Sequence, residues 1–109
     1  MQPEDRVRIL HILDACESVG RFVTGRRREE LDTDEMLLFA LVRAVEIIGE
    51  AGARVSEPTQ VAMSEVPWAR MAGMRNRLIH AYFDVDRDVL WRTATDDVPA
   101  LAAALAHHR

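Results

Sequence analysis

Four polar residues with catalytic potential lie within one short segment of the chain: Arg75, Asn76, His80 and Tyr82. Because histidine titrates near neutral pH, it can accept the proton of a ribose 2′-hydroxyl group or donate one to a leaving oxygen. An arginine can hold a phosphate through two hydrogen bonds and stabilise the charge of the transition state. Asn76 can orient the imidazole ring or bind a phosphate oxygen. The set suits RNA cleavage without a metal ion, although an arginine and a histidine at this spacing, taken alone, are more often ordinary surface residues of a helix.

This segment is expected to be helical, and helical geometry separates the four side chains into two pairs. Asn76 and His80 are four positions apart and stack on one face. Arg75 and Tyr82, seven positions apart, share a second face at a separation on the order of 10 Å along the axis. Arg75 and His80 differ by about 140° around a straight helix. A site that uses both needs a helix end near His80, a long reach by Arg75, or a second copy of the helix, and the last alternative predicts a homodimer.

The rest of the chain shows helical periodicity, and no stretch has the alternation of a strand. A first helix is expected over about residues 5–23, where apolar residues recur every three or four positions. A second helix, capped by Asp32 or Thr33, continues to about residue 55. Residues 56–64 break the pattern and are expected to form the longest loop.

Two further helices complete the predicted bundle. The third is capped by Ser64 and carries the polar motif through Tyr82. The fourth starts near Arg87, and Pro99 must kink or split it, because proline lacks a backbone donor and clashes with the preceding turn. The sequence thus predicts an all-α fold, an antiparallel four- to five-helix bundle, in a single domain over residues 1–109.

Two groups of potential metal ligands are interpreted without a metal. Asp84 and Asp86 fit a turn and a helix cap better than a Mg²⁺ site. His107 and His108, near the end of the sequence, lack further ligands at a suitable spacing. No metal ion and no other cofactor is therefore predicted.

Several other residues are assigned to structure rather than to chemistry. Glu46 and Glu50 lie four positions apart on the apolar second helix. An ion pair with Arg43, or with an arginine from another helix, is favoured over a role in a cleft. Trp68 and Trp91 fit the bundle core or a dimer interface better than base stacking.

The composition describes a globular protein with an acidic excess. The chain has 109 residues, a formal net charge of −4 and a pI near 5.5, which counts against a general nucleic-acid coat rich in Lys and Arg. The basic residues are nevertheless clustered, and Arg70 and Arg77 near the motif are candidate RNA contacts. The single cysteine, Cys16, cannot form an internal disulfide, and the N-terminus does not resemble a signal peptide. We expect a cytoplasmic protein that does not span a membrane.

The chain resembles the HepT family of HEPN-domain toxins over nearly its whole length. The family motif, Arg-Asn-x3-His-x-Tyr, is matched by Arg75, Asn76, His80 and Tyr82. Further matching segments are Trp68, Gly73-Met74, Asp84-Val85-Asp86, the run Arg43 to Ala51, and Asp96-Asp97-Val98-Pro99. Several segments in the right order make the resemblance more specific than the motif alone.

The resemblance implies a toxin of a toxin–antitoxin system. In this family the helical bundle dimerises, and the third-helix motifs of both subunits line a shared cleft. Arg75 and His80 would be the residues of an endoribonuclease that acts on tRNA or mRNA, with Asn76 assisting. A cognate MntA-like nucleotidyltransferase would neutralise the toxin by transferring AMP onto Tyr82. The added phosphates would lie beside Arg75, occupy the anion site and repel RNA.

Two alternatives come from the diversity of HEPN domains and from the acidic pI. The chain would then be a non-catalytic partner of a nucleotidyltransferase, or a dimeric nucleotide-binding module. Growth inhibition on expression alone argues against the first alternative, and saturable binding of a free nucleotide supports the second.

Overall fold

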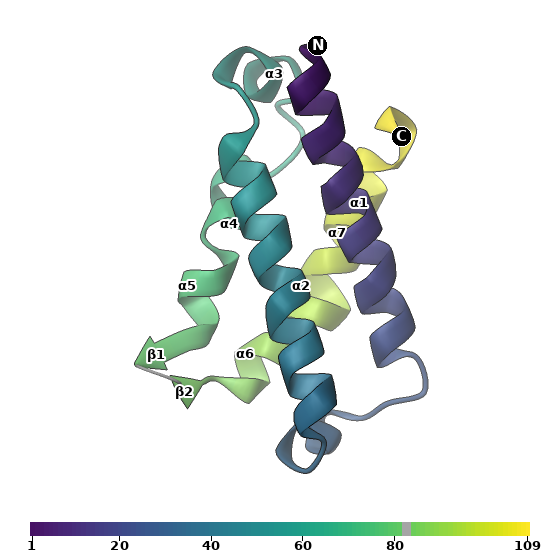
Figure 1. Cartoon of the computed structure of the whole chain (residues 1–109), viewed down its shortest axis with the longest axis vertical. Coiled ribbons are helices and arrows are strands. Elements are labelled where there is room, and N and C mark those ends of the chain that lie inside the picture. Colours follow the sequence, from purple (N-terminus) through teal and green to yellow (C-terminus); the bar gives the residue numbers. More distant parts are fainter. Residues whose placement is uncertain (82–83) are drawn as a thin grey trace.

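The structure is a computed structural model that describes residues 1–81 and 84–109, with only the backbone described at His80 and Ala81. Two long helices, α1 (Pro3–Val23) and α2 (Glu35–Arg54), run antiparallel, and the later helices pack against them (Figure 1). The later helices are, in chain order, α4 (Trp68–Ala72), α5 (Met74–Leu78), α6 (Arg87–Arg92) and α7 (Val98–Leu105). The predicted all-α class is confirmed. None of the helices within the described residues has the length and apolar content that a membrane span requires.

The first helix matches its prediction closely. Its apolar stripe is buried against the rest of the bundle and comprises Ile9, Ile12, Leu13, Cys16 and Val19. Burial raises the pKa of the Cys16 thiol to about 12. The thiol therefore stays protonated and packs as a small apolar group, as expected from its position on the stripe.

The second helix begins one or two residues later than predicted, because its cap is Asp34 rather than Asp32 or Thr33. The carboxylate of Asp34 accepts a hydrogen bond from the backbone N–H of Leu37 at 3.1 Å. Asp32 instead ends a short 3₁₀ helix, η1 (Arg28–Asp32), and Thr33 follows it. The turn before η1 is made by Gly25, whose φ of 72° favours glycine.

Two glycines allow α4 to pack closely against α2. A Cβ at Gly52 would overlap the sulfur of Met71, and a Cβ at Gly49 would lie 3.4 Å from the Met71 carbonyl oxygen. Met71 is fully buried at this contact. The close approach fixes α4, and hence the start of the motif-bearing segment, against the centre of the bundle.

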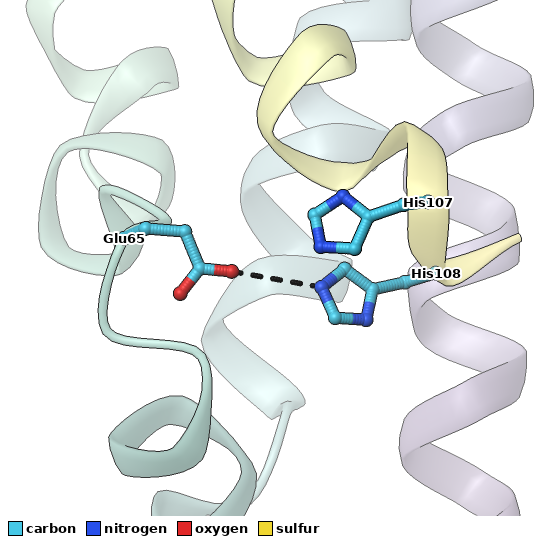
Figure 2. Close-up of side chains that lie close together, drawn as sticks. All are labelled: Glu65, His107 and His108. Atoms are coloured by element: carbon cyan, nitrogen blue, oxygen red, sulfur yellow. Dashed lines mark ion pairs between the residues drawn. The ribbon is translucent and has the colours of Figure 1, made fainter.

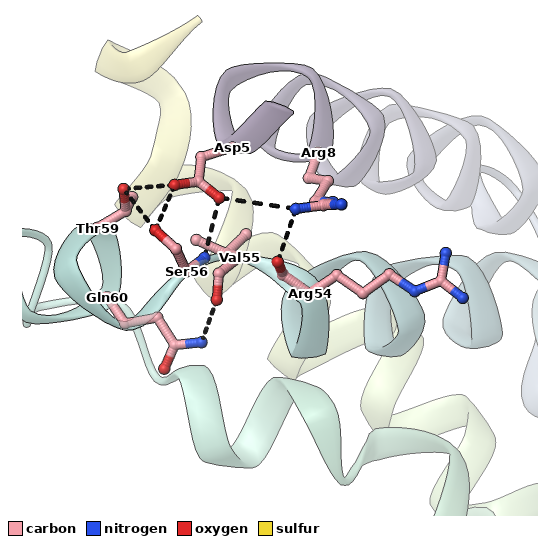
Figure 3. A network of polar contacts seen from close by, with 7 residues as sticks. All are labelled: Asp5, Arg8, Arg54, Val55, Ser56, Thr59 and Gln60. Carbon is pink, nitrogen blue, oxygen red and sulfur yellow. Dashed lines mark hydrogen bonds and ion pairs between the residues drawn. The ribbon is translucent and has the colours of Figure 1, made fainter. Parts of the chain in front are cut away.

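Residues 56–64 were predicted to form a loop, and this prediction was wrong, because they contain α3 (Glu57–Ala62). The cap of this helix comes from α1. The buried carboxylate of Asp5 accepts hydrogen bonds from the backbone N–H of Ser56 at 2.9 Å, from the Ser56 hydroxyl at 2.5 Å and from the Thr59 hydroxyl at 2.7 Å (Figure 3). A cap supplied by a residue so distant in the sequence leaves no local signal.

The third helix differs most from its prediction. It breaks at Gly73, between α4 and α5, and it ends at Leu78 rather than continuing to Tyr82. After Leu78 the chain forms β1 (Ile79–Ala81), which pairs antiparallel with β2 (Asp84–Val85). The backbone N–H of Asp86 donates to the carbonyl oxygen of Leu78 at 2.6 Å, which closes this short pairing. No strand was predicted, because two such short segments cannot show a recognisable alternation.

The last helical region is split, as Pro99 predicted. Asp86 caps α6, and its carboxylate accepts from the N–H of Val89 at 3.0 Å, which confirms the predicted cap. A π-helical turn, η2 (Thr93–Asp97), separates α6 from α7, and Pro99 lies in the first turn of α7. Because proline has no N–H to continue the ladder, the wider turn changes the register before the helix resumes. A short 3₁₀ helix, η3 (Ala106–His108), follows α7.

Candidate functional site

A surface groove of about 960 Å³ lies beside the end of α5. It is bounded by η1 and its following residue, by α2 as far as Glu46, by α5 with the β1–β2 pairing, and by the start of α6. Its lining residues are Leu31, Asp32, Thr33, Glu35, Leu38, Phe39, Val42, Glu46, Arg75, Ile79, Val85 and Arg87. The lining thus combines apolar residues with two arginines and several acids, and it includes the motif residue Arg75.

Arg75 is oriented in the groove by an acid from α2. Its Nε lies 3.4 Å from Oε2 of Glu46, and the two side chains are 50% and 26% exposed. The half-exposed guanidinium remains accessible to an anion while the carboxylate restricts its rotamers. This confirms the prediction that Glu46 pairs with an arginine of another helix. Glu46 also lines the groove, so it contributes to the site as well as to the fold.

The position of His80 differs from the helical prediction. Because α5 ends at Leu78, His80 belongs to β1, and the expected stacking of Asn76 and His80 on one helix face was wrong. The register of the β1–β2 pairing shifts between Ile79 and Ala81, at the position of His80. Such irregularities bend a strand locally. A helix end near His80 was one of the three ways to combine it with Arg75. The backbone has such an end, because α5 stops at Leu78.

Asn76 is exposed on α5 beside Arg75. Tyr82 lies outside the described residues, and so does the side chain of His80. The catalytic assignment of His80 and the modification of Tyr82 therefore stay predictions from the sequence. What the fold adds is the course of the backbone: Ile79, the neighbour of His80, lines the same groove as Arg75.

The two candidate RNA contacts lie together, but in a different depression. Nη1 of Arg77 donates to the carbonyl oxygen of Arg70 at 2.9 Å, and Nη2 of Arg70 lies 3.2 Å from both carboxylate oxygens of Asp97. These residues line a depression of about 550 Å³ together with Val89, Arg92, Thr93 and Asp96. Arg75 and Arg77 are two positions apart on α5, roughly 200° around the helix, so they face different sides.

Phe39 lines the groove but was not predicted from the sequence as a site residue. It lies in the apolar run of α2, yet its side chain is 61% exposed. Met36, one turn earlier, is 83% exposed. Periodicity could not reveal this exposure, because an apolar residue gives the same signal whether a partner covers it from the same chain or from another.

Comparison with known proteins places the chain in one family. A family model described as "Ribonuclease HepT-like" matches residues 12–107. The chain is 42% identical over 90 residues to the "Probable ribonuclease HepT" of Thermococcus cleftensis, an alignment that covers 83% of this chain and 82% of that protein. A relative from Caldanaerobacter subterraneus subsp. tengcongensis, provisionally named an RNase, is 41% identical, with 84% and 81% covered.

A third relative, from Methanocaldococcus jannaschii and also provisionally named an RNase, is 37% identical, with 83% of each chain covered. No solved structure matches the chain. The family model and these relatives agree with the resemblance drawn from the motif and its flanking segments. The chain belongs to the HepT-like ribonuclease family.

Proposed function

We propose that this chain is a toxin that cleaves RNA as an endoribonuclease without a metal ion. The observation that carries the proposal is the complete Arg-Asn-x3-His-x-Tyr motif at the end of α5, with Arg75 oriented in an accessible groove by Glu46. Family membership and the ribonuclease names of the relatives support the reaction class.

The chemistry assigns catalytic roles to three of the motif residues. Arg75 binds the scissile phosphate and stabilises the charge on its equatorial oxygens as the 2′-oxygen attacks phosphorus. His80 accepts the proton of the 2′-hydroxyl, and the bond to the 5′-oxygen breaks as that oxygen takes up a proton. Asn76 binds a phosphate oxygen or orients His80. The products are a 2′,3′-cyclic phosphate and a 5′-hydroxyl.

The site is completed in a homodimer. Met36 and Phe39 form an exposed apolar patch next to the groove, and a second copy of the chain is the occupant we assign to it. In such a dimer the motif segment of the second subunit lies beside the groove and contributes to the catalytic set. The motif segments of both subunits then line a shared cleft.

Neutralisation occurs on Tyr82. A cognate MntA-like nucleotidyltransferase transfers AMP onto the tyrosine hydroxyl, whose oxygen attacks the α-phosphorus of ATP and releases pyrophosphate. The added phosphate occupies the anion site at Arg75 and excludes the RNA backbone. Exchange of Tyr82→Phe should therefore leave a toxin that the antitoxin cannot modify, and mass spectrometry of the two proteins after incubation with ATP reports the difference.

The experiment that tests cleavage uses purified protein, tRNA or mRNA, and an excess of EDTA. The wild type should cleave, whereas Arg75→Ala and His80→Ala should lose about 10²–10³-fold in rate, as expected for removal of a group that stabilises or protonates the transition state. His11→Ala, which changes an exposed histidine on α1, is the matched control. Cleavage that requires added Mg²⁺, or that survives His80→Ala, contradicts the proposal.

The acidic pI keeps one alternative in view, a non-catalytic partner of a nucleotidyltransferase. Under this alternative the protein forms the complex but does not inhibit growth when it is expressed alone. Growth inhibition by the wild type but not by His80→Ala excludes it.

A further inference from the structure

Three potential metal ligands from distant parts of the sequence meet near the C-terminal end of the fold. Glu65 lies in the connection between α3 and α4, whereas His107 and His108 lie in η3 (Figure 2). One ligand atom from each residue lies within 4.8 Å of the other two. No metal was predicted at these histidines because the sequence has no further ligand at a suitable spacing, and Glu65 supplies one through the fold.

The imidazole of His108 has a buried nitrogen without a hydrogen-bond partner among the described residues. Its Nε2 is inaccessible to solvent, and the nearest carboxylate atom, Oε1 of Glu65, lies 3.6 Å away. This separation is too long for a hydrogen bond. A buried polar atom left unpaired is costly and rare, so this nitrogen points to a ligand that lies between the two side chains.

The donor set identifies the class of ligand. Two imidazole nitrogens and one carboxylate oxygen are the donors found in many zinc sites, whereas Mg²⁺ prefers oxygen alone. Around a tetrahedral zinc ion with bonds of about 2.0–2.2 Å, ligand atoms lie about 3.3–3.6 Å apart. The present spacing reaches that value by small side-chain rotations, because Glu65 and His107 are exposed and free to adjust.

The backbone around the three residues is held in place. Arg109, directly after His108, binds α1 through Asp14 and Glu17, at 3.2 and 3.1 Å. On the other side, the indole Nε1 of Trp68 donates to the carbonyl oxygen of Met63 at 3.0 Å, which closes the loop that carries Glu65. Both halves are therefore positioned before a metal ion arrives, and the cost of ordering them is small.

We propose that Glu65, His107 and His108 bind one divalent transition-metal ion of the zinc class, with water as the remaining ligand. The ion cross-links η3 to the α3–α4 connection and so fastens the C-terminal end of α7 to the bundle. The site lies at the opposite end of the long axis from β1 and β2 (Figure 1), away from the groove that contains Arg75. Its role is structural, and RNA cleavage in EDTA does not depend on it.

The test uses the full chain, expressed without a polyhistidine tag and stripped with EDTA before exhaustive dialysis. Isothermal titration with ZnCl₂ should show one ion per chain with micromolar affinity. At free zinc about ten times the dissociation constant, the Tm should rise by about 5 °C. MgCl₂ at the same concentration should cause no rise, because the site has two nitrogen ligands.

Variants assign the binding to these side chains. His108→Ala and His107→Ala should weaken zinc binding by roughly 100-fold, and Glu65→Gln by roughly tenfold, because each removes one bond to the ion. His11→Ala should bind zinc as the wild type does, since His11 is an exposed histidine on α1. Circular dichroism of each apo-variant checks that it is folded.

Co²⁺ gives a second readout that does not depend on stability. The wild type should show the visible absorption of tetrahedral cobalt, and His108→Ala should lose it. The proposal is overturned if folded wild-type protein shows no stoichiometric binding of ZnCl₂, or if the binding persists at full affinity in His108→Ala.

Discussion

Arg75 on α5 and Glu46 on α2 form an ion pair across the candidate groove, with 3.4 Å between Nε and Oε2. The pair connects the motif to α2, which packs against α1, α4 and α5. It also presents a mechanistic conflict, because a carboxylate beside the phosphate-binding arginine orients the guanidinium but repels the phosphate. Whether Glu46 favours or opposes cleavage depends on the relative sizes of this orientation and this repulsion.

Glu46→Gln should lower kcat/KM for RNA cleavage by about tenfold. Removing a charge about 6 Å from the phosphate relieves only about 0.7 kcal/mol in water, roughly a threefold gain. A misplaced catalytic group costs up to about 100-fold, so the loss of orientation should dominate. Steady-state kinetics on a short RNA measure the change. Stability should change by no more than about 1 kcal/mol, because both partners are partly solvated.

Glu50→Gln is the control for this prediction. Glu50 lies one turn later on α2, pairs with Arg43 at 3.9 Å and does not line the groove. It should leave cleavage unchanged. A similar loss in both variants would mean that the effect comes from α2 as a whole rather than from Arg75.

The double variant Arg70→Ala/Arg77→Ala should weaken RNA binding without changing kcat. These arginines lie in a depression separate from the Arg75 groove, so they can contact the backbone of bound RNA but not the scissile phosphate. If each neutralises one phosphate of a single strand, the slope of log K against log salt should become shallower by about 1.4. Binding titrations at several salt concentrations measure the slope, and an unchanged slope with a reduced kcat would contradict the assignment.

The helices that periodicity predicted well are those whose signal lies in their own residues. The stripe of α1 repeats every three or four residues and is buried as expected, and Pro99 splits the last helix because its chemistry is local. By contrast, α3 depends on a cap from Asp5, and the end of α5 depends on the hydrogen bond between Asp86 and Leu78. Neither contact has a signal in the neighbouring residues.

The candidate site was predictable in its residue types but not in its geometry. The motif identified Arg75, and the position of Glu46 on the second helix suggested an ion pair with Arg43 or with an arginine from another helix. The fold pairs Glu46 with Arg75. The motif also suggested one continuous helix for Asn76 and His80, which the break at Leu78 removes. Glu65 was missed for the same reason as the cap of α3, since only the tertiary fold brings it to His107 and His108.

Phe39→Asp should convert the proposed dimer to a monomer and abolish RNA cleavage. An exposed phenylalanine contributes to an interface chiefly by burying apolar area, and a buried unpaired carboxylate in its place costs several kcal/mol. Light scattering at micromolar concentration should give the mass of two chains for the wild type and of one chain for the variant.

Val61→Asp is the matched control for the dimer prediction. Val61 is 69% exposed on α3, outside the lining of the groove. This variant should stay dimeric and active. A monomeric wild type, or a Phe39→Asp variant that remains dimeric, would remove the argument for a site shared between subunits.

Asp5→Asn should destabilise the fold more at neutral pH than at pH 3. Hydrogen bonds from the Ser56 hydroxyl, the Ser56 N–H and the Thr59 hydroxyl lower the pKa of Asp5 below its ordinary value of 3.8. A carboxylate whose pKa is lower in the folded state than in the unfolded state stabilises the protein above pH 3.8, and this contribution is lost as the pH falls through the folded-state pKa. The amide of the variant has no charge at any pH and accepts fewer of these hydrogen bonds.

Thermal unfolding at pH 7 and pH 3 measures this difference. The gap in Tm between wild type and Asp5→Asn should be clear at pH 7 and should narrow at pH 3, where the carboxyl of the unfolded state is largely protonated, so that unfolding takes up a proton. Glu4→Gln is the control, because Glu4 is the exposed neighbour of Asp5 in the same turn of α1. A gap that stays constant with pH would mean that the charge of Asp5 does not stabilise the cap of α3.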